Sequence, residues 1–125
     1  MRGVIKKVAL VAILMGLTIA GNSTAAFAAD HDGSWTVRVI TEQGKCDRTS
    51  SYDVSVSNGS INYSSYTSVS LSGTISPQGA VMVSIRHFDD GAHGSGLLNR
   101  HTGSGGWRGA GKNGVCSGRW EAHRR

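Results

Sequence analysis

The chain of 125 residues has a single proline, two cysteines and few aromatic residues, which make up 6% of it. Beyond the apolar run near its start, no segment repeats apolar residues at the spacing of an amphipathic helix. No later segment is apolar enough to cross a membrane either. These absences argue against a helical fold and against a membrane span in the mature chain.

Sequence motifs of catalysis are also missing. There is no G-x-S-x-G segment of a serine hydrolase and no H-E-x-x-H segment of a zinc protease. Asp89 and Asp90 are adjacent, so on a strand they would point to opposite faces and could not form the facing carboxylate pair of a glycosidase. The spacings of structural zinc sites are absent as well. We therefore predict that the protein is not an enzyme and holds no metal.

Positive charge is present but not clustered. The chain has 13 Lys and Arg against 8 Asp and Glu, a formal net charge of +5. The basic residues are scattered, apart from Arg124 and Arg125 at the end of the chain. Nucleic-acid binding needs a basic patch, commonly interleaved with aromatic residues. We therefore expect no nucleic-acid partner.

The first 28 residues have the three parts of a secretory signal peptide. "MRGVIKK" is basic, "VALVAILMGLTIAG" is uncharged and mostly apolar, and Ala26 and Ala28 form an A-x-A cleavage signal. The alternative, a membrane anchor, would need an apolar run of about 20 residues. We predict cleavage after Ala28 and a single secreted domain over residues 29–125, periplasmic or extracellular. Three basic residues leave with the signal, so ten basic residues then face eight acidic ones, a net charge of +2.

Cys46 and Cys116 are the only cysteines, and they are not part of a C-x-x-C motif. An even number of cysteines in a small exported domain predicts a disulfide. The bridge would close a loop of about 70 residues, which the chain-entropy model values at roughly 4 kcal/mol. We predict that it ties the last strand back to the first loop.

Alternation of apolar and polar residues predicts the secondary structure. Eight segments read as short strands: "WTVRVI", "YDVSVS", "SINYS", "SVSLSGTIS", "AVMVSIRHF", "GSGLLN", "GGWRG" and "VCSGRWEA". In the last one Cys116, Trp120 and Ala122 share a face. Short strands joined by tight turns predict an all-β fold, an up-and-down meander of about eight antiparallel strands. It forms either a small closed barrel or an open sandwich.

Turn residues separate these strands. Asn58-Gly59 is a strong hairpin signal, and Pro77 with Gly79 predicts a second turn. Asp90-Gly91 and Asn113-Gly114 predict two more. Other glycines fall within strands, where they permit the bends of a small barrel. The glycines of "TGSGG" at 102–106 are better explained as flexible filler.

Tryptophans mark both ends of the domain. "GSW" at 33–35 opens it and "GRW" at 118–120 closes it. A Gly-x-Trp on the first strand, with an arginine of the last strand packed over the tryptophan, is similar to the arrangement in calycin barrels. Arg119 of "GRW" is the candidate for this arginine. We name Trp35, Trp107, Arg119 and Trp120 as candidate core or binding residues. Bulky Trp and Val side chains can fill so small an interior completely. The sequence therefore does not decide whether the barrel contains a pocket.

"RHFDDGAH" at 86–93 gathers two His and two Asp residues. It reads either as a ligand-binding or catalytic cluster or as a polar hairpin tip, with Asp-Asp-Gly in the turn. His87 and His93 are candidate binding residues. A haem cofactor could not be attached covalently, because C-x-x-C-H is absent. Non-covalent haem would take His87, His93 or Met82 as axial ligands.

The cysteine, tryptophan and turn pattern also resembles a group of small exported alphaproteobacterial proteins over nearly the whole mature chain. The residues that carry the resemblance are Cys46, Asp47, Arg48, Trp107, Cys116, Gly118 and Trp120. The resemblance implies a link to haem utilisation or adhesion. Asp47 and Arg48 could anchor the first loop or form a recognition patch.

From these observations we expect a secreted, non-enzymatic binding or interaction module with an unknown protein or small ligand as its partner. One alternative is a periplasmic protease inhibitor of the small-barrel type, which would place its N-terminal tail, with His31, on a zinc protease. The other is a structural envelope protein with no small ligand. A cavity beside Trp107 or Trp120 would favour the binding module.

Overall fold

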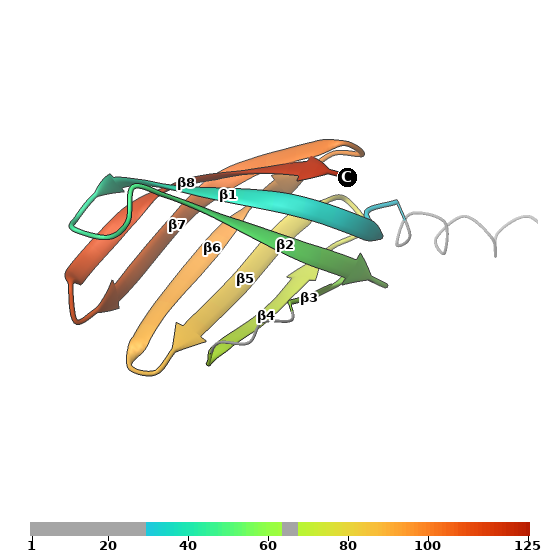
Figure 1. Cartoon of the computed structure of the whole chain (residues 1–125). Coiled ribbons are helices and arrows are strands. Elements are labelled where there is room, and N and C mark those ends of the chain that lie inside the picture. Colours follow the sequence, from blue (N-terminus) through green and yellow to red (C-terminus); the bar gives the residue numbers. More distant parts are fainter. Residues whose placement is uncertain (1–29, 64–67) are drawn as a thin grey trace, which may run out of the picture.

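The computed structural model describes residues 30–63 and 68–125, so the signal-peptide prediction lies outside the described part of the chain. The described residues form eight strands and no helix (Figure 1). The strands are β1 (Gly33–Gln43), β2 (Thr49–Ser57), β3 (Ser60–Asn62), β4 (Val69–Ile75), β5 (Ala80–His87), β6 (Asp90–Leu98), β7 (Thr102–Gly111) and β8 (Gly114–Arg124).

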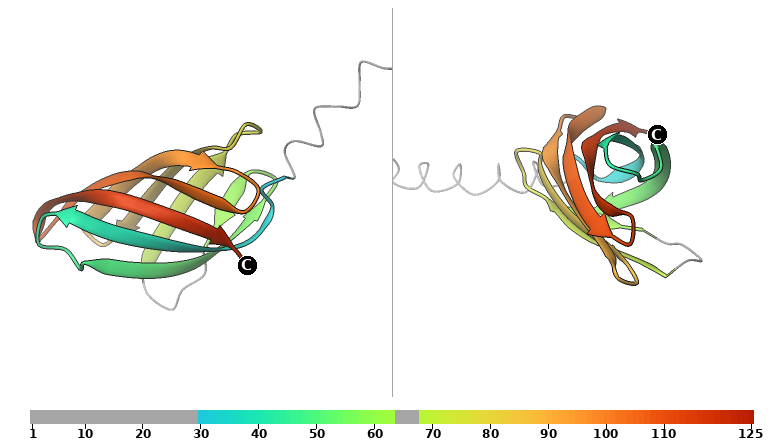
Figure 2. Two further views of the ribbon diagram at one scale, coloured as in Figure 1. Left: turned by 90° about the horizontal axis from the view of Figure 1, so that it is seen from above. Right: turned by 90° about the vertical axis from the view of Figure 1, so that its left-hand side faces the viewer.

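Each strand pairs with the next one in antiparallel fashion, and β8 pairs with β1. The sheet therefore closes on itself as an up-and-down barrel, and the right-hand view of Figure 2 shows the strands arranged in a ring. The closing pair runs from Trp35 opposite Arg124 to Gln43 opposite Ser117, with one irregularity before Gln43. The barrel is confirmed, and the open sandwich is wrong, because a sandwich would leave β1 and β8 as edges.

Two of the predicted turns are where the sequence places them. Asn58 and Gly59 have φ angles of 50° and 77°, as a two-residue type I′ hairpin between β2 and β3 requires. At the β4–β5 turn the amide of Gly79 donates to the carbonyl of Ser76 over 2.9 Å. The turn predicted at Asp90-Gly91 is wrong. His87 pairs with Asp90, so Phe88 and Asp89 form this turn and β6 begins at Asp90.

The glycine-rich segment 102–106 is not filler. It is the first half of β7, paired on both sides with β6 and β8. Gly96 of β6 lies opposite Gly105 of β7, and a Cβ on Gly105 would stand 2.7 Å from the Gly96 Cα. Glycine is needed at both positions because the two backbones and the ring of Trp120 approach closely there.

The core lies at one end of the barrel, where the chain enters at residue 30 and leaves after β8 (Figure 2). Alternate residues of the strands point inward, as the two-residue period requires. The buried apolar residues of this core are Trp35, Val54, Val56, Ile75, Val81, Leu98, Trp120 and Ala122. Cys116 is also buried, but it lies toward the opposite end of the barrel, in the disulfide with Cys46. Trp35 and Cys116 are the most deeply buried, each with 1% of its surface exposed.

The predicted disulfide is present. Cys46, in the loop between β1 and β2, is bonded to Cys116 of β8, and their Cα atoms are 6.2 Å apart. The same loop is held by Thr41, whose amide donates to the carbonyl of Arg48 and whose hydroxyl donates to the carbonyl of Asp47. Asp47 and Arg48 thus anchor the loop through their backbone carbonyls. Among the described residues their side chains form no ion pair.

Candidate functional site

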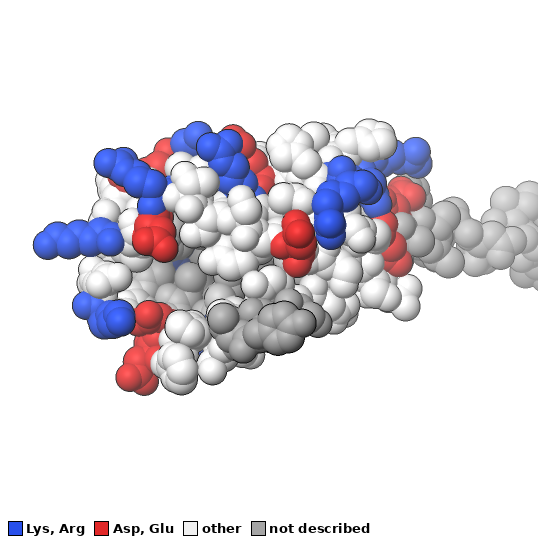
Figure 3. Space-filling model, in the orientation of Figure 1, with Lys and Arg blue, Asp and Glu red and all other residues white. Residues whose placement is uncertain are grey.

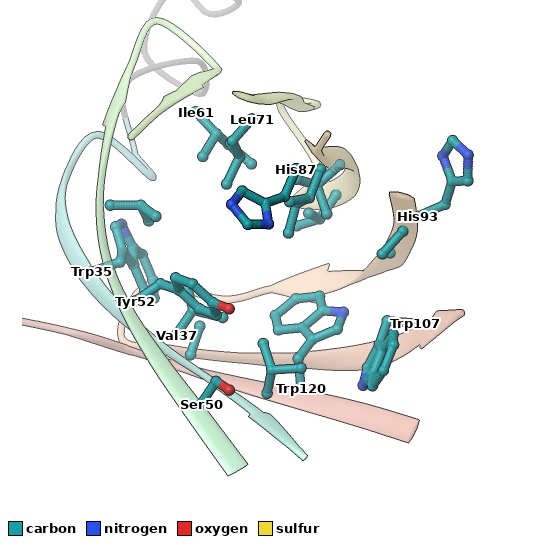
Figure 4. A pocket seen from close by; sticks show the side chains of 18 of the residues that line it. Trp35, Val37, Ser50, Tyr52, Ile61, Leu71, His87, His93, Trp107 and Trp120 are labelled. Atoms are coloured by element: carbon teal, nitrogen blue, oxygen red, sulfur yellow. The ribbon is translucent and has the colours of Figure 1, made fainter. Parts of the chain in front are cut away.

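The barrel contains a cavity of about 430 Å³ (Figure 4). Apolar side chains of β1, β2, β4, β5 and β8 line most of it, and Trp107 and Trp120 are among the lining residues. Cavities of roughly 300–1,000 Å³ lined in this way are typical of small-molecule sites. The Trp and Val side chains therefore do not fill the interior. This answers the question that the sequence did not decide.

One end of the cavity is closed. Trp35 forms its floor, and the indole N–H donates to the carbonyl of His31 over 2.9 Å. The guanidinium of Arg124 lies over the Trp35 ring, with its Cζ atom 4.7 Å from the ring centroid. Arg124 also donates to the backbone carbonyls of Asp30, Asp32 and Arg100, so it holds the incoming chain across the end of the barrel.

The expected contact between a tryptophan of β1 and an arginine of the last strand is therefore made by Arg124. Arg119 lies on the outer face of β8, where it donates to the carboxylate of Glu42 over 3.1 Å. Residues of even number along β8 point inward near Trp120 and Ala122, so Arg119 faces solvent. Arg124, five residues later, reaches the floor because the strand ends there and its long side chain crosses the barrel end.

The wall of the cavity is formed by Trp120 and Trp107, which lie against glycine-rich strands. A Cβ on Gly96 would stand 2.6 Å from the Trp120 ring, so the missing side chain is what makes room for the indole beside β6. The Trp120 N–H donates to the carbonyl of Ser95, and the Trp107 N–H donates to the carbonyl of Ile40.

The other end is the mouth, where the β1–β2, β5–β6 and β7–β8 connections meet. Cys46, Asp47, His87, Asp90 and Asn113 line the cavity there. A smaller cavity of about 170 Å³ adjoins it and shares most of these residues. Figure 3 shows acidic and basic side chains side by side at this left-hand end, with no large patch of one sign on the face in view.

The two candidate histidines differ. The His87 ring points into the cavity, whereas the His93 ring points away from it (Figure 4). His93 Nδ1 is 2.9 Å from the hydroxyl of Ser84 on the outer face. Met82, the third haem ligand considered, is also outside, with 68% of its surface exposed. Alternation along β5 and β6 explains this split, because only one face of each strand can line the barrel.

Next to His87, Phe88 occupies the β5–β6 turn with a φ of 56° and 74% of its surface exposed. A bulky aromatic residue with positive φ is uncommon, and its ring lies against that of His87 with centroids 4.7 Å apart. At the opposite end, His31 is only 6% exposed, so its imidazole is not offered to a partner.

Sequence reasoning missed Tyr52 and the acidic residues of the mouth. Tyr52 lines the cavity from β2, and its ring meets that of Tyr63 edge to face with centroids 5.8 Å apart. Alternation placed Tyr52 on the inner face but did not mark it as a site. No local signal could have joined Asp47 with Asp90, because 43 positions separate them and only barrel closure brings their loops together.

Within residues 30–63 and 68–125, no three His, Cys, Asp or Glu side chains are close enough to hold a metal ion. The same part of the chain contains no helix that could cross a membrane. Comparisons with protein-family models, curated proteins and solved structures found no match. The function must therefore be argued from the cavity itself.

Proposed function

We propose that this chain is an exported, non-enzymatic binding module whose barrel takes up a small apolar molecule. The observation that carries the proposal is the cavity of about 430 Å³ beside Trp107 and Trp120. An empty apolar volume of this size is costly in a small domain, because interiors are normally close-packed. A ligand that buries its apolar surface there gains roughly 25 cal/mol for each Å² removed from water.

The cavity is closed at one end and accessible at the other. A rigid floor of Trp35 and Arg124 closes one end, and the mouth leaves the other accessible. The disulfide between Cys46 and Cys116 braces the β1–β2 loop at the mouth. A disulfide is stable in oxidising compartments, which supports a periplasmic or extracellular location together with the predicted signal peptide.

The test uses the oxidised domain, residues 29–125, and the neutral fluorophore N-phenyl-1-naphthylamine. We expect saturable one-to-one binding with increased probe fluorescence. Ala92→Trp fills the cavity from β6 and should abolish binding, whereas Met82→Trp adds the same ring outside the barrel and should leave it unchanged. Equal binding by the two variants would contradict an internal site.

Haem is a second candidate ligand, favoured by the single observation that the His87 ring points into the cavity. His87 would supply an axial ligand from β5, whereas the His93 ring points away from the cavity and Met82 lies on the outer surface. Titration with haemin should then give a saturable Soret shift that is lost in His87→Ala and retained in His93→Ala. A shift that survives His87→Ala would mean that haemin binds elsewhere on the surface.

For the alternative of a protease inhibitor, the described residues offer no support at the N-terminal tail. His31 is buried against the closed end of the barrel, and the carbonyls of Asp30 and Asp32 accept from Arg124. A structural envelope protein would not need an internal cavity of this size. The cavity therefore makes the binding module the better-supported proposal.

A further inference from the structure

The polar groups of the cavity limit which ligand it can hold. All three indole N–H groups are already used: Trp35 donates to His31, Trp107 to Ile40 and Trp120 to Ser95, over 2.9, 3.0 and 3.1 Å. Their acceptors are backbone carbonyls. The tryptophans therefore present only ring carbon to the cavity, and none of them is left to donate to a ligand.

Besides Asn113 at the mouth, three polar side chains in the wall of the cavity remain for a ligand. Ser50, Tyr52 and His87 line the cavity, and no hydrogen bond to another described residue occupies their side chains. Tyr52 of β2 and His87 of β5 face the interior from opposite walls (Figure 4). A hydroxyl or an imidazole can donate or accept, so each can pair with an uncharged oxygen.

The charged groups of the cavity are of one sign. Among the described residues that line it there is no Lys or Arg, and the carboxylates of Asp47 and Asp90 stand at the mouth. Asp90 is fixed there, because its Oδ1 accepts from the amide of Lys112 over 3.0 Å. Lys45 and Lys112 belong to the same loops but are exposed and do not line the cavity.

An anionic head group would be unfavourable both deep in the barrel and at its mouth. Deep in the barrel it would lose its hydration with no cation to pair with. At the mouth it would stand beside two carboxylates of like charge. A neutral alcohol, ketone or phenol avoids both costs, because its one oxygen can bond with Tyr52 or His87 while the apolar body fills the barrel.

Building on the proposed function, we infer that the barrel selects uncharged apolar molecules carrying one hydrogen-bonding oxygen, and that Asp47 and Asp90 reject anions at its mouth. This makes the two aspartates specificity-determining residues. It also separates the two candidate ligands above, since haemin carries two carboxylates and should be held poorly.

The test compares 1-decanol with decanoate at pH 8 as competitors of bound N-phenyl-1-naphthylamine. The two share a chain length and differ in head-group charge. We expect 1-decanol to displace the probe at a concentration at least about tenfold lower than decanoate. Equal displacement, or displacement by neither, would overturn the inference while the bound probe still upholds the proposed function. If the probe itself does not bind, both fail.

A double variant tests the role of the aspartates. Asp47→Asn with Asp90→Asn keeps side-chain shape and the acceptor for the Lys112 amide but removes both charges. We expect decanoate to bind about tenfold more tightly and 1-decanol to change less than about twofold. Asp89→Asn, an exposed residue of the same hairpin outside the cavity lining, is the matched control. Unchanged decanoate binding in the double variant, or an equal gain in the control, would overturn the inference.

Discussion

At the scale of single residues, one cation closes the barrel. Arg124 combines a cation–π contact with Trp35 and hydrogen bonds to three carbonyls of segments that cross the barrel end. Charge-assisted hydrogen bonds to a partly buried arginine are stronger than those of a neutral donor. Arg119, five residues earlier on the same strand, forms exposed ion pairs with Glu42 and Glu121.

We predict that Arg124→Gln lowers the free energy of unfolding by about 2–4 kcal/mol, since it loses the cation–π contact and most of the hydrogen bonds. Arg119→Gln should cost less than about 1 kcal/mol, as is usual for exposed ion pairs. Urea denaturation followed by tryptophan fluorescence measures both values. Equal losses would show that Arg124 does not hold the barrel end.

A second residue-scale prediction concerns the glycines under Trp120. A Cβ on Gly96 would clash with the Ser104 carbonyl oxygen and stand 2.6 Å from the Trp120 ring, so Gly96→Ala forces the indole or the strands apart. We expect a loss of about 1–3 kcal/mol in unfolding free energy and a changed near-ultraviolet circular dichroism spectrum.

Gly106→Ala is the matched control for this change. Its Cβ would meet only the Gly118 carbonyl, at 3.6 Å, so we expect little change in stability and an unchanged spectrum. Loss of stability in the control to the same extent would mean that strand glycines matter for backbone reasons alone, and that Trp120 is not what Gly96 accommodates.

At the scale of elements, the barrel wall is uneven. β1, β7 and β8 are 10 or 11 residues long. β3 has three residues, and within residues 30–63 and 68–125 it pairs with β4 through Ser60 and Thr74 alone. The wall is therefore best paired where β7, β8 and β1 meet and least paired at β3. Local opening is expected where few backbone hydrogen bonds must break.

We predict that the amides of β3 exchange with deuterium at least about 100-fold faster than those at the centre of β8 under native conditions. Hydrogen exchange followed by mass spectrometry or NMR measures this difference. The type I′ turn at Asn58-Gly59 serves as an internal reference for the rate of an exposed hairpin. Similar protection of β3 and β8 would show that the barrel opens only as a whole.

At the scale of the whole molecule, the closed sheet and one disulfide stabilise a barrel whose core does not fill its interior. Apart from Cys116, the buried apolar residues form one cluster, and the same residues line the cavity, so the core does not fill the interior. Cys46–Cys116 joins the β1–β2 loop to β8, across a sequence separation of 70 residues. It constrains the unfolded chain and also braces the mouth.

We predict that the double change Cys46→Ser with Cys116→Ser lowers the free energy of unfolding by about 2–4 kcal/mol. Because the disulfide braces the mouth, probe affinity should fall in the folded variant as well. Urea denaturation and probe titration, each compared with the oxidised parent, measure the two effects. A loss of stability with unchanged affinity would limit the disulfide to folding.

Much of the fold could be predicted because strand signals are local. Alternation placed all eight strands, and Asn58-Gly59 was correct as a turn. The errors of prediction concern residues whose local preference for a turn or loop is overridden by pairing with neighbouring strands. The segment 102–106 reads as filler but is strand because β6 and β8 hold it on both sides, and Asp90 belongs to β6 because it pairs with His87.

The candidate site could be predicted only in part. Trp107, Trp120 and His87 do line the cavity. His93 also borders it, but its ring points away, and Arg119 is not among the lining residues. Whether a side chain points into a barrel depends on which face of its strand turns inward. In the segment "DGAHGSG" at 90–96 no alternation of apolar and polar residues marks that face. The error at Arg119 arose from the choice of arginine, since Arg124 makes the expected contact.

By itself, the sequence determined the all-β class, the number of strands and the disulfide. Alternation and turn residues are local signals of strands, and the presence of two cysteines predicts a single bridge. Tertiary structure alone decided that the sheet closes and that a cavity remains. It also decided that Asp47 and Asp90 both line the mouth of the cavity. These features depend on the distance between strands far apart in the chain and on how side chains share the enclosed volume, and no local pattern encodes either.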